Sequence, residues 1–450
     1  MRLTIIHPAI GRRAGQRYIR SWQMEPLPAA LIAGLTPADT DIRFYDDRME
    51  LIPYDEPTEL VAISVETYTA RRAYQIASEF RRRGVPVVMG GFHATLCPEE
   101  VARFAESIVV GEAEEVWPQV IDDFRHGSLQ ARYEGKPRTG LAGLSYDRSI
   151  FHGKRYLPLG LVEAGRGCRY RCEFCAIQSF FDARHQLRPV EEIIAELHTL
   201  KGSKRLFFFV DDNFANDRQA ARELLEALVP LRIPWVTQLS IDAAHDADFL
   251  ALLARAGCKG VLIGFESLDK VTLQQMGKGF NAMRGGYQGA LDNLSRVHIR
   301  VYATFVFGYD RDTPDTFAQA LDFSLEQQFY IAAFNHLTPF PGTPLYQRLQ
   351  AEGRLLYDPW WLDERYSYNG LPFRPIGMEP SEIQRHCVET RRRFYSFPSI
   401  LRRGLATVNR SDAFMFRNFF TINLMHRTEI GQRDHYPLGD VAWKGQLLEA

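Results

Sequence analysis

Short apolar runs alternate with amphipathic segments over the first 125 residues of the chain. Between two of these runs, residues 70–84 place apolar side chains at helical spacing and stop at Gly84. This β-α-β rhythm predicts an α/β fold with a parallel, doubly wound sheet, in which ligands bind beyond the carboxyl ends of the strands. The apolar runs have the length of strands: residues 2–10, 41–47, 60–68, 85–91 and 107–115.

A second series of strands and helices begins near residue 156 and continues to residue 345. It contains six strand–helix units, fewer than the eight of a closed β/α barrel. The sequence therefore predicts a partial (β/α)6 barrel of the TIM type. Polar side chains follow where its strands end: Asp211, Asp212, Gln238, Glu266 and Asp310.

These patterns predict four segments. Residues 1–135 form the first α/β domain, and residues 136–155, polar and rich in glycine, form a linker. Residues 156–345 form the partial barrel, and residues 346–450 form a mainly helical C-terminal domain with many aromatic side chains. The basic run Arg391–Arg393 in this last segment is typical of a solvated helix face.

Composition narrows the class of protein. Hydrophobic residues make up 46% of the chain and charged residues 24%, the balance of a soluble globular protein. The formal net charge of −1 gives no overall field that favours nucleic acid or anionic membranes. The N-terminus reads as a strand and not as a signal peptide, and no run approaches the ~20 apolar residues that span a bilayer. Six cysteines in 450 residues do not make a disulfide framework. We expect a cytoplasmic, monomeric enzyme without a transmembrane segment that binds no nucleic acid.

Half of the cysteines stand together, in the stretch GRGCRYRCEFCAIQ at residues 165–178. A zinc site needs four ligands, and Cys168, Cys172 and Cys175 supply three, with His185 ten residues farther on. A redox dithiol uses only the last two cysteines, and inert buried cysteines do not fit the charged neighbours. The fourth interpretation is an iron–sulfur cluster, for which three thiolates leave one iron open to bind a small molecule.

The C-x3-C-x2-C spacing, with an aromatic residue before the last cysteine and a position after the first strand of a partial barrel, resembles the radical S-adenosylmethionine superfamily. The resemblance implies a [4Fe–4S] cluster on Cys168, Cys172 and Cys175 whose open iron binds the amino and carboxylate groups of S-adenosylmethionine. It also implies an electron donor such as flavodoxin or ferredoxin, and cleavage of the cofactor to a 5′-deoxyadenosyl radical.

The same resemblance implies which side chains contact S-adenosylmethionine. Phe174 would pack near the cluster and the adenine, and Asp211 or Asp212 would face the methionine amine. Gln238 and Glu266 end the next two strands, where ribose and methionine contacts are expected. For each acid the alternative is a solvated charge at the edge of a loop.

Residues 1–125 resemble the flavodoxin-like (Rossmann-type) cobalamin-binding domain found upstream of many radical S-adenosylmethionine enzymes. The D-x-H-x-x-G pattern that supplies a histidine ligand to cobalt in other cobalamin proteins is missing. This absence implies cobalamin bound base-off, without a histidine on cobalt. An enzyme that kept this fold but lost cobalamin would have nearly the same sequence pattern. The residues implied to contact cobalamin are Ser64, Val65, Glu66, Thr67, Gly90, Gly91, Phe92, His93, Gly111 and Glu112.

The segment beyond residue 337 resembles the C-terminal domain of a subgroup that includes the hopanoid C-methylases, and its aromatic residues either close the barrel mouth over a substrate or form an ordinary helical core. The leading hypothesis is a cobalamin-dependent radical enzyme that methylates an unactivated carbon of a small, possibly lipid-like molecule. One alternative is a radical oxidative cyclase or carbon–carbon coupling enzyme. A second alternative is a non-catalytic protein that binds cobalamin and an iron–sulfur cluster.

Overall fold

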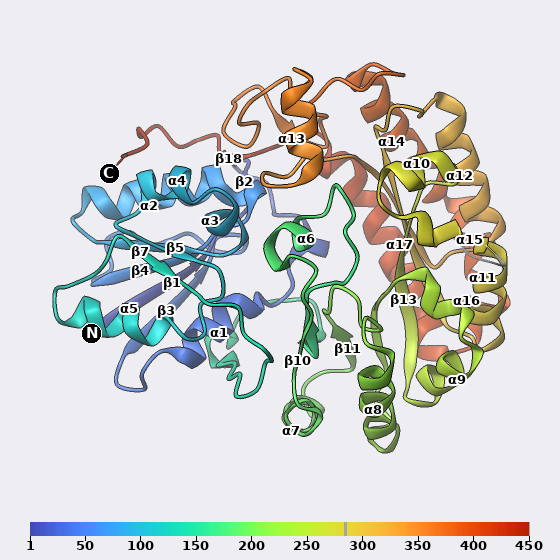
Figure 1. Ribbon diagram of the computed structural model, residues 1–450, viewed down its shortest axis with the longest axis horizontal. Helices are drawn as coiled ribbons and strands as arrows, with labels where there is room; N and C mark the ends of the chain where they lie inside the picture. The colour runs from blue at the N-terminus through green and yellow to red at the C-terminus, as the bar shows by residue number, and fades with distance from the viewer. Residues whose placement is uncertain (283–285, 450) are drawn as a thin grey trace.

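The computed structural model describes residues 1–282 and 286–449, and its first part is built on a six-stranded parallel sheet, here called the N-terminal sheet (Figure 1). Helices α1 (Leu27–Leu35) and α5 (Trp117–Arg125) pack on one face, and α2 (Ala70–Arg82) packs on the other. Helices on both faces bury both sides of the strands, which confirms the predicted α/β class. The strands follow the order β3 (Asp41–Asp46), β1 (Arg2–His7), β4 (Leu60–Ser64), β5 (Val87–Gly90), β6 (Ser107–Val110) and β7 (Arg132–Glu134).

A second six-stranded parallel sheet, here called the second sheet, follows in strict chain order, so the carboxyl ends of its strands meet at one rim. Its outward side chains, such as Ile263 and Phe265, form the larger hydrophobic core with the crossover helices. The strands are β8 (Leu159–Val162), β11 (Leu206–Phe209), β12 (Trp235–Leu239), β13 (Cys258–Glu266), β14 (Arg300–Phe307) and β15 (Ile331–His336). The crossover helices are α7 (Val190–Leu200), α8 (Arg218–Leu228), α9 (Ala247–Arg255), α10 (Lys270–Gln275), α11 (Gly286–Arg296) and α12 (Pro314–Glu326).

The last strand of the second sheet, β15, is covered by C-terminal helices whose side chains satisfy its free backbone groups. Arg391 Nε donates to the carbonyl of Phe334 at 2.9 Å, and the Tyr395 hydroxyl donates to that of Ala332 at 2.9 Å. An unpaired strand edge is thereby closed by helices and not by further strands. These helices are α14 (Pro380–Phe394), α15 (Phe397–Gly404), α16 (Thr407–Arg410) and α17 (Ala413–Arg433).

The chain then returns to the N-terminal sheet, where Figure 1 shows its C-terminal end. Strand β18 (Gly439–Asp440) pairs in parallel with β2 (Gly11–Arg12), and the amide of Asp440 donates to Gln75 of α2 at 2.7 Å. Residues 436–448, here called the strap, therefore join the last helices to the first domain.

The segment predicted as a linker packs against the N-terminal sheet. Phe151 of this segment is buried beside Phe44, with ring centroids 5.7 Å apart. Strand β7, which the sequence pattern does not predict, adds a sixth strand just before it. None of the helices in the described residues is both long and apolar enough to cross a bilayer. The remaining short elements are α3 (Phe92–Leu96), α4 (Pro98–Val101), α6 (Ala176–Phe181), α13 (Pro344–Ala351), β9 (Gly165–Arg166), β10 (Gln186–Leu187), β16 (Ser367–Tyr368) and β17 (Tyr436–Pro437).

Candidate active site

A cavity of about 470 Å³ lies between the carboxyl ends of the N-terminal strands and the start of the second sheet. Apolar side chains of β1, β4 and α1 form much of its wall, and the segment that follows the cysteines supplies Phe180 and Phe181. Phe180 packs on Phe92 of α3, with ring centroids 4.5 Å apart, so the two parts of the chain meet here. The predicted residues that line the cavity are Ser64, Glu66, Gly90, Gly91, Phe92, Gly111, Glu112 and Asp212.

Two of the lining glycines are required by the backbone itself. Gly91 has φ +102°, and a Cβ there would lie 3.0 Å from the carbonyl oxygen of Val65. Gly111 has φ +81°, and a Cβ there would lie 2.6 Å from the carbonyl oxygen of Gly135. Both positions favour glycine because the neighbouring strand-end loops approach closely.

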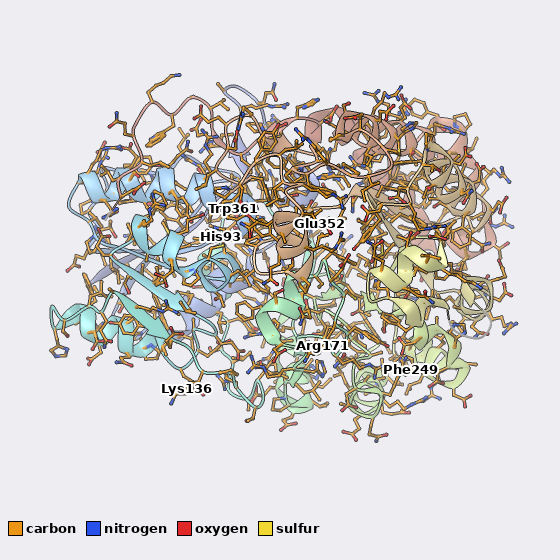
Figure 2. The ribbon with its side chains drawn as sticks, turned by 45° about the horizontal axis from the view of Figure 1, so that its top comes forward. His93, Lys136, Arg171, Phe249, Glu352 and Trp361 are labelled. Carbon is orange, nitrogen blue, oxygen red and sulfur yellow. The ribbon has the colours of Figure 1, made fainter. Side chains whose placement is uncertain are left out.

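Three residues implied to contact cobalamin are not among those that line the cavity. Val65 is fully buried in the hydrophobic core beneath α2. The His93 ring nitrogens lie 3.2 Å from the Thr67 hydroxyl and 3.1 Å from a Glu100 carboxylate oxygen. The edge of the His93 ring meets Trp361 of the C-terminal segment, as Figure 2 shows. Val65, Thr67 and His93 therefore hold the first domain against that segment.

His7, at the end of β1, lines the cavity, although the sequence pattern did not single it out. Burial lowers its pKa to about 3, so the ring is neutral at physiological pH. Glu66 also faces the cavity, and burial raises the pKa of its carboxyl. Each is accessible from the cavity but enclosed by protein.

The cysteine loop, residues 167–175, lies between β9 and α6 and is fixed by side chains that follow β11. Asp211 Oδ1 accepts from the amides of Ala164 and Gly165 at 2.8 and 2.6 Å. Asp212 Oδ2 accepts from the amide of Gly167 at 2.8 Å. The two predicted aspartates thus differ: Asp211 is buried behind the loop, and Asp212 faces the cavity.

Burial is the largest influence on the pKa of both aspartates. It raises the pKa of Asp211 to about 8 and that of Asp212 to about 6, although backbone amides that donate to the carboxylates oppose the shift. Gln238, at the next strand end, donates its side-chain amide to the carbonyl of Asp211 at 3.1 Å. Asp211, Asp212 and Gln238 therefore form one contiguous rim.

Glu266, at the end of β13, continues this rim and is paired with a residue that sequence reasoning missed. Lys278 Nζ lies 2.8 Å from Glu266 Oε1 and 3.2 Å from the carbonyl of Gly264, and both charges are largely buried. Lys278 also lies close enough to Cys172 and Cys175 to act on both thiols electrostatically. The ring of Phe174 packs partly buried against the core of the second sheet.

The three cysteines of the loop are free, as are the other three in the chain. Cys172 is buried, and burial raises its pKa to about 12, so its thiol needs a bound cation to ionise. In the described residues no three His, Cys, Asp or Glu side chains are gathered closely enough to hold a single metal ion. Thiolates hold iron–sulfur clusters, so the all-thiol donor set of Cys168, Cys172 and Cys175 fits such a cluster.

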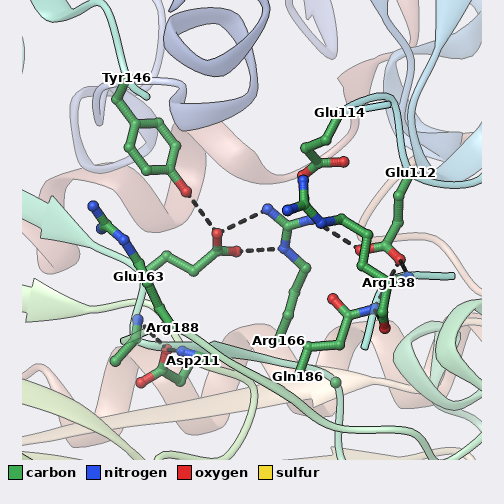
Figure 3. A network of polar contacts seen from close by, with 12 residues as sticks. Glu112, Glu114, Arg138, Tyr146, Glu163, Arg166, Gln186, Arg188 and Asp211 are labelled. Carbon is green, nitrogen blue, oxygen red and sulfur yellow. Dashed lines mark hydrogen bonds and ion pairs between the residues drawn. The ribbon is translucent and has the colours of Figure 1, made fainter. Parts of the chain in front are cut away.

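Figure 3 shows a buried ionic network around Arg166, a residue that lines the cavity and directly precedes the cysteine loop. Arg166, two residues before Cys168, pairs with Glu114 at 2.6 Å and Glu112 at 3.2 Å from the loop after β6. It also holds Glu163 at 2.8 Å. Burial raises the pKa of Glu163, but Arg166, Tyr146 and Arg188 together more than offset this, and the net shift is downward.

Comparisons with known proteins agree with this arrangement. Residues 162–324 match the family model of the Radical SAM superfamily. The chain is 28% identical over 389 residues to bacteriochlorophyllide d C-12(1)-methyltransferase of Chlorobaculum tepidum, which covers 84% of each protein. It is 28% identical to hopanoid C-2 methylase of Rhodopseudomonas palustris, over 74% of this chain and 66% of that one.

A solved structure shares the fold across both sheets. The radical S-adenosylmethionine methyltransferase TsrM of Kitasatospora setae, solved with cobalamin and a [4Fe–4S] cluster bound, aligns with a TM-score of 0.60 and 17% identity, over 78% of each chain. The cysteine loop falls at the start of the region that the family model matches, and the carboxylate rim lies within it. The match over residues 162–324 confirms the resemblance to the radical S-adenosylmethionine superfamily that was drawn from the cysteine spacing.

Proposed function

We propose that this protein is a cobalamin-dependent radical S-adenosylmethionine C-methyltransferase. The observation that carries the proposal is one cavity lined both by the N-terminal strand ends and by residues on either side of the cysteine loop, such as Arg166 and Phe180. A methyl carrier and a hydrogen-abstracting cofactor must act on the same carbon, so a shared cavity is what the reaction needs. The methyltransferase and methylase names of the two relatives support the choice of reaction.

The chemistry of the donor sets supports a place for each cofactor in this proposal. Cys168, Cys172 and Cys175 would hold the [4Fe–4S] cluster, and Asp212, Gln238 and Glu266 would orient S-adenosylmethionine beside it. The apolar cavity wall and the strand ends at Glu66 and Gly111 would hold cobalamin. When bound, the cluster with S-adenosylmethionine supplies hydrogen-atom abstraction, and cobalamin supplies a transferable methyl group.

The chain's own residues position these groups and exclude water. Asp212 holds the cysteine loop through the amide of Gly167, and Asp211 holds the backbone just before the loop through the amide of Gly165. Arg166 anchors the same segment to Glu112 and Glu114. Phe92 of α3 packs on Phe180 of α6 and closes the contact between the two parts of the chain. The absence of a histidine ligand on cobalt stays a prediction, for which His7 is the residue to examine because it lines the cavity.

The substrate is proposed to be a large, mainly apolar molecule. The names of the relatives specify a bacteriochlorophyllide and a hopanoid, both of which are extended ring systems. In this chain, Leu262, Tyr302 and Ile331 lie side by side in register on adjacent strands. They share the face of the sheet opposite the outward core residues, so the inner surface offers apolar contacts.

The domain limits remain part of the proposal: residues 1–135 as a flavodoxin-like cobalamin domain, 136–155 as a linker, 156–345 as a partial (β/α)6 barrel and 346–450 as a helical extension. We also propose a cytoplasmic monomer that receives electrons from a flavodoxin or ferredoxin. The strict chain order of the second sheet supports the partial barrel.

Anaerobic reconstitution tests the proposal. The protein is loaded with iron, sulfide and cobalamin, and incubated with S-adenosylmethionine and a reductant. We expect the visible absorbance of a [4Fe–4S] cluster, a cobalamin spectrum and formation of 5′-deoxyadenosine. Cys172→Ala should lose the cluster absorbance, and Cys97→Ala, which alters a cysteine outside the loop, should keep it.

The possible failures separate the parts of the proposal. An intact cluster without 5′-deoxyadenosine would exclude a radical enzyme and favour a binding protein. 5′-Deoxyadenosine without retained cobalamin would exclude the methyltransferase and leave another radical reaction.

A further inference from the structure

The far end of the molecule from the N-terminal sheet carries a surface that the fold leaves uncovered, here called the basic apolar patch. Figure 1 shows α15, α16 and α17 at this end. The apolar members of the patch are Phe397, Leu401, Leu405 and Leu424, and its basic members are Arg392, Arg393, Arg402, Arg410 and Arg417.

The apolar members form a continuous stripe. Phe397 and Leu401 of α15 and Leu405, which caps its C-terminal end, follow one another at four-residue spacing, so they share one face of the helix. Their exposed fractions are 61%, 57% and 53%, and that of Leu424 on the neighbouring α17 is 40%. The opposite face of α15 is buried through Ile400, Arg403 and Gly404. The helix therefore exposes an apolar face to solvent in addition to the face that it buries in the core. Packing within the chain does not require this exposed apolar face.

The charge around this stripe is one-sided. Residues 391–428 contain eight arginines and one aspartate, in a chain whose net charge is −1. That aspartate, Asp412, is already paired with Lys259 at 2.9 Å. Within the described residues, the five arginines of the patch form no ion pair with a carboxylate. Arg427 lies over the Phe397 ring at 4.3 Å, which places a further cation against the apolar stripe.

We propose that the basic apolar patch docks on the surface of an anionic lipid bilayer. Phenylalanine and leucine side chains on one exposed helix face suit the boundary between head groups and acyl chains. Exposed arginines beside them suit lipid phosphates, since basic residues near an anionic leaflet are attracted to its negative surface potential. The protein lies on the membrane and does not cross it.

The same observations disfavour a second copy of the chain as the occupant. A two-fold dimer through this patch would bring the arginines of one protomer against those of the other, without carboxylates to pair them. Nucleic acid would satisfy the arginines but not the leucine stripe. The proposal does not depend on the enzymatic activity and holds for the protein with or without its cofactors.

Flotation of the full-length protein with lipid vesicles tests the proposal. We expect binding to vesicles of phosphatidylcholine and phosphatidylglycerol in equal amounts, weak binding to pure phosphatidylcholine, and a marked decrease of binding in 1 M salt. The triple variant F397S/L401S/L405S should bind at least about tenfold less, because three inserted side chains are lost. The control variant L51S/I376S removes two apolar side chains that are equally exposed elsewhere, and should bind as the parent does.

The proposal is overturned if the protein stays with the unbound fraction on anionic vesicles, or if the triple variant binds as tightly as the parent. It is also overturned if sedimentation shows a dimer that only the triple variant dissolves, since the patch would then be a protein interface. Circular dichroism and the thermal unfolding midpoint should match the parent in both variants.

Discussion

Lys278 and Glu266 form a buried ion pair at the rim of the second sheet, where the cysteine loop lies close by. Burying the pair costs free energy because both charges lose their hydration, and the attraction between the two charges offsets that cost. Removing one partner leaves the other charge buried and uncompensated. The rim therefore depends on both residues more than on either alone.

We expect Lys278→Met to lower the free energy of unfolding of the cofactor-free protein by about 3 kcal/mol. The double variant K278M/E266Q should lose less than the sum of the two single variants, because no lone charge remains. Urea denaturation of the four proteins measures this coupling. Strictly additive losses would show that the two side chains do not interact.

Asp211 makes the folded protein less stable as pH rises, whereas an ordinary aspartate paired with a cation makes it more stable. Burial raises its pKa to about 8 in the folded protein, against about 3.8 for the unfolded chain, so the folded state binds the proton more tightly. Its contribution to stability is fully present below pH 4 and is lost as pH rises through 8, with a limiting slope of about 1.4 kcal/mol per pH unit.

Asp211→Asn isolates this contribution, because its side-chain oxygen still accepts from Ala164 and Gly165. We expect the free energy of unfolding of the parent to fall relative to D211N between pH 5 and pH 8. Denaturation at several pH values measures the difference. Parallel curves for the two proteins would mean that Asp211 is already ionised at pH 5.

At the scale of whole elements, the C-terminal helices cover the free edge of β15, as a seventh strand would in a longer sheet. Arg403 is fully buried, with its guanidinium carbon 3.8 Å from the centre of the Phe394 ring. It donates to the carbonyls of Phe329 and Phe394 at 2.9 and 3.0 Å and to the Asn423 side chain at 3.0 Å. One side chain thus ties α14, α15 and α17 to the start of β15.

Arg403→Ala should lower the free energy of unfolding by about 3 kcal/mol, since it leaves a cavity and buried carbonyls without donors. Its neighbour provides a matched control, because Arg402 is exposed and belongs to no ion pair in the described residues. Arg402→Ala should change stability by less than about 0.5 kcal/mol. Equal effects of the two substitutions in urea denaturation would contradict the assigned role of Arg403.

The local patterns predicted the two runs of strands and helices, the cysteine loop and the strand-end carboxylates, because each depends on neighbouring residues. They did not predict Arg166 or Lys278 as site residues, whose partners come from other parts of the fold. The family resemblance also implied cobalamin contacts for Val65, Thr67 and His93, which do not line the cavity, since a strand-end motif does not tell which face a side chain takes. Strand β7 was missed because three residues carry too weak a pattern.

At the scale of the whole molecule, the strap is the connection that spans the most sequence. The Tyr436 hydroxyl donates to the carbonyl of Gly11 across 425 positions, and the Trp443 ring and the Leu448 amide donate to Glu79 and Ser78 of α2. Deleting residues 439–450 should raise amide hydrogen exchange in α2 by tenfold or more, while exchange in β13 stays unchanged. Equal exchange rates in α2 with and without residues 439–450 would show that the stability of the first domain does not depend on the strap.

The strap also sets an order of events during synthesis. The strands and helices of the first domain leave the ribosome early, but the partners of Gln75, Ser78 and Glu79 are made only after both sheets and α17. Until the strap is synthesised, one side of α2 stays exposed and the first domain lacks these contacts. The strap therefore completes the packing of the domain that is synthesised first.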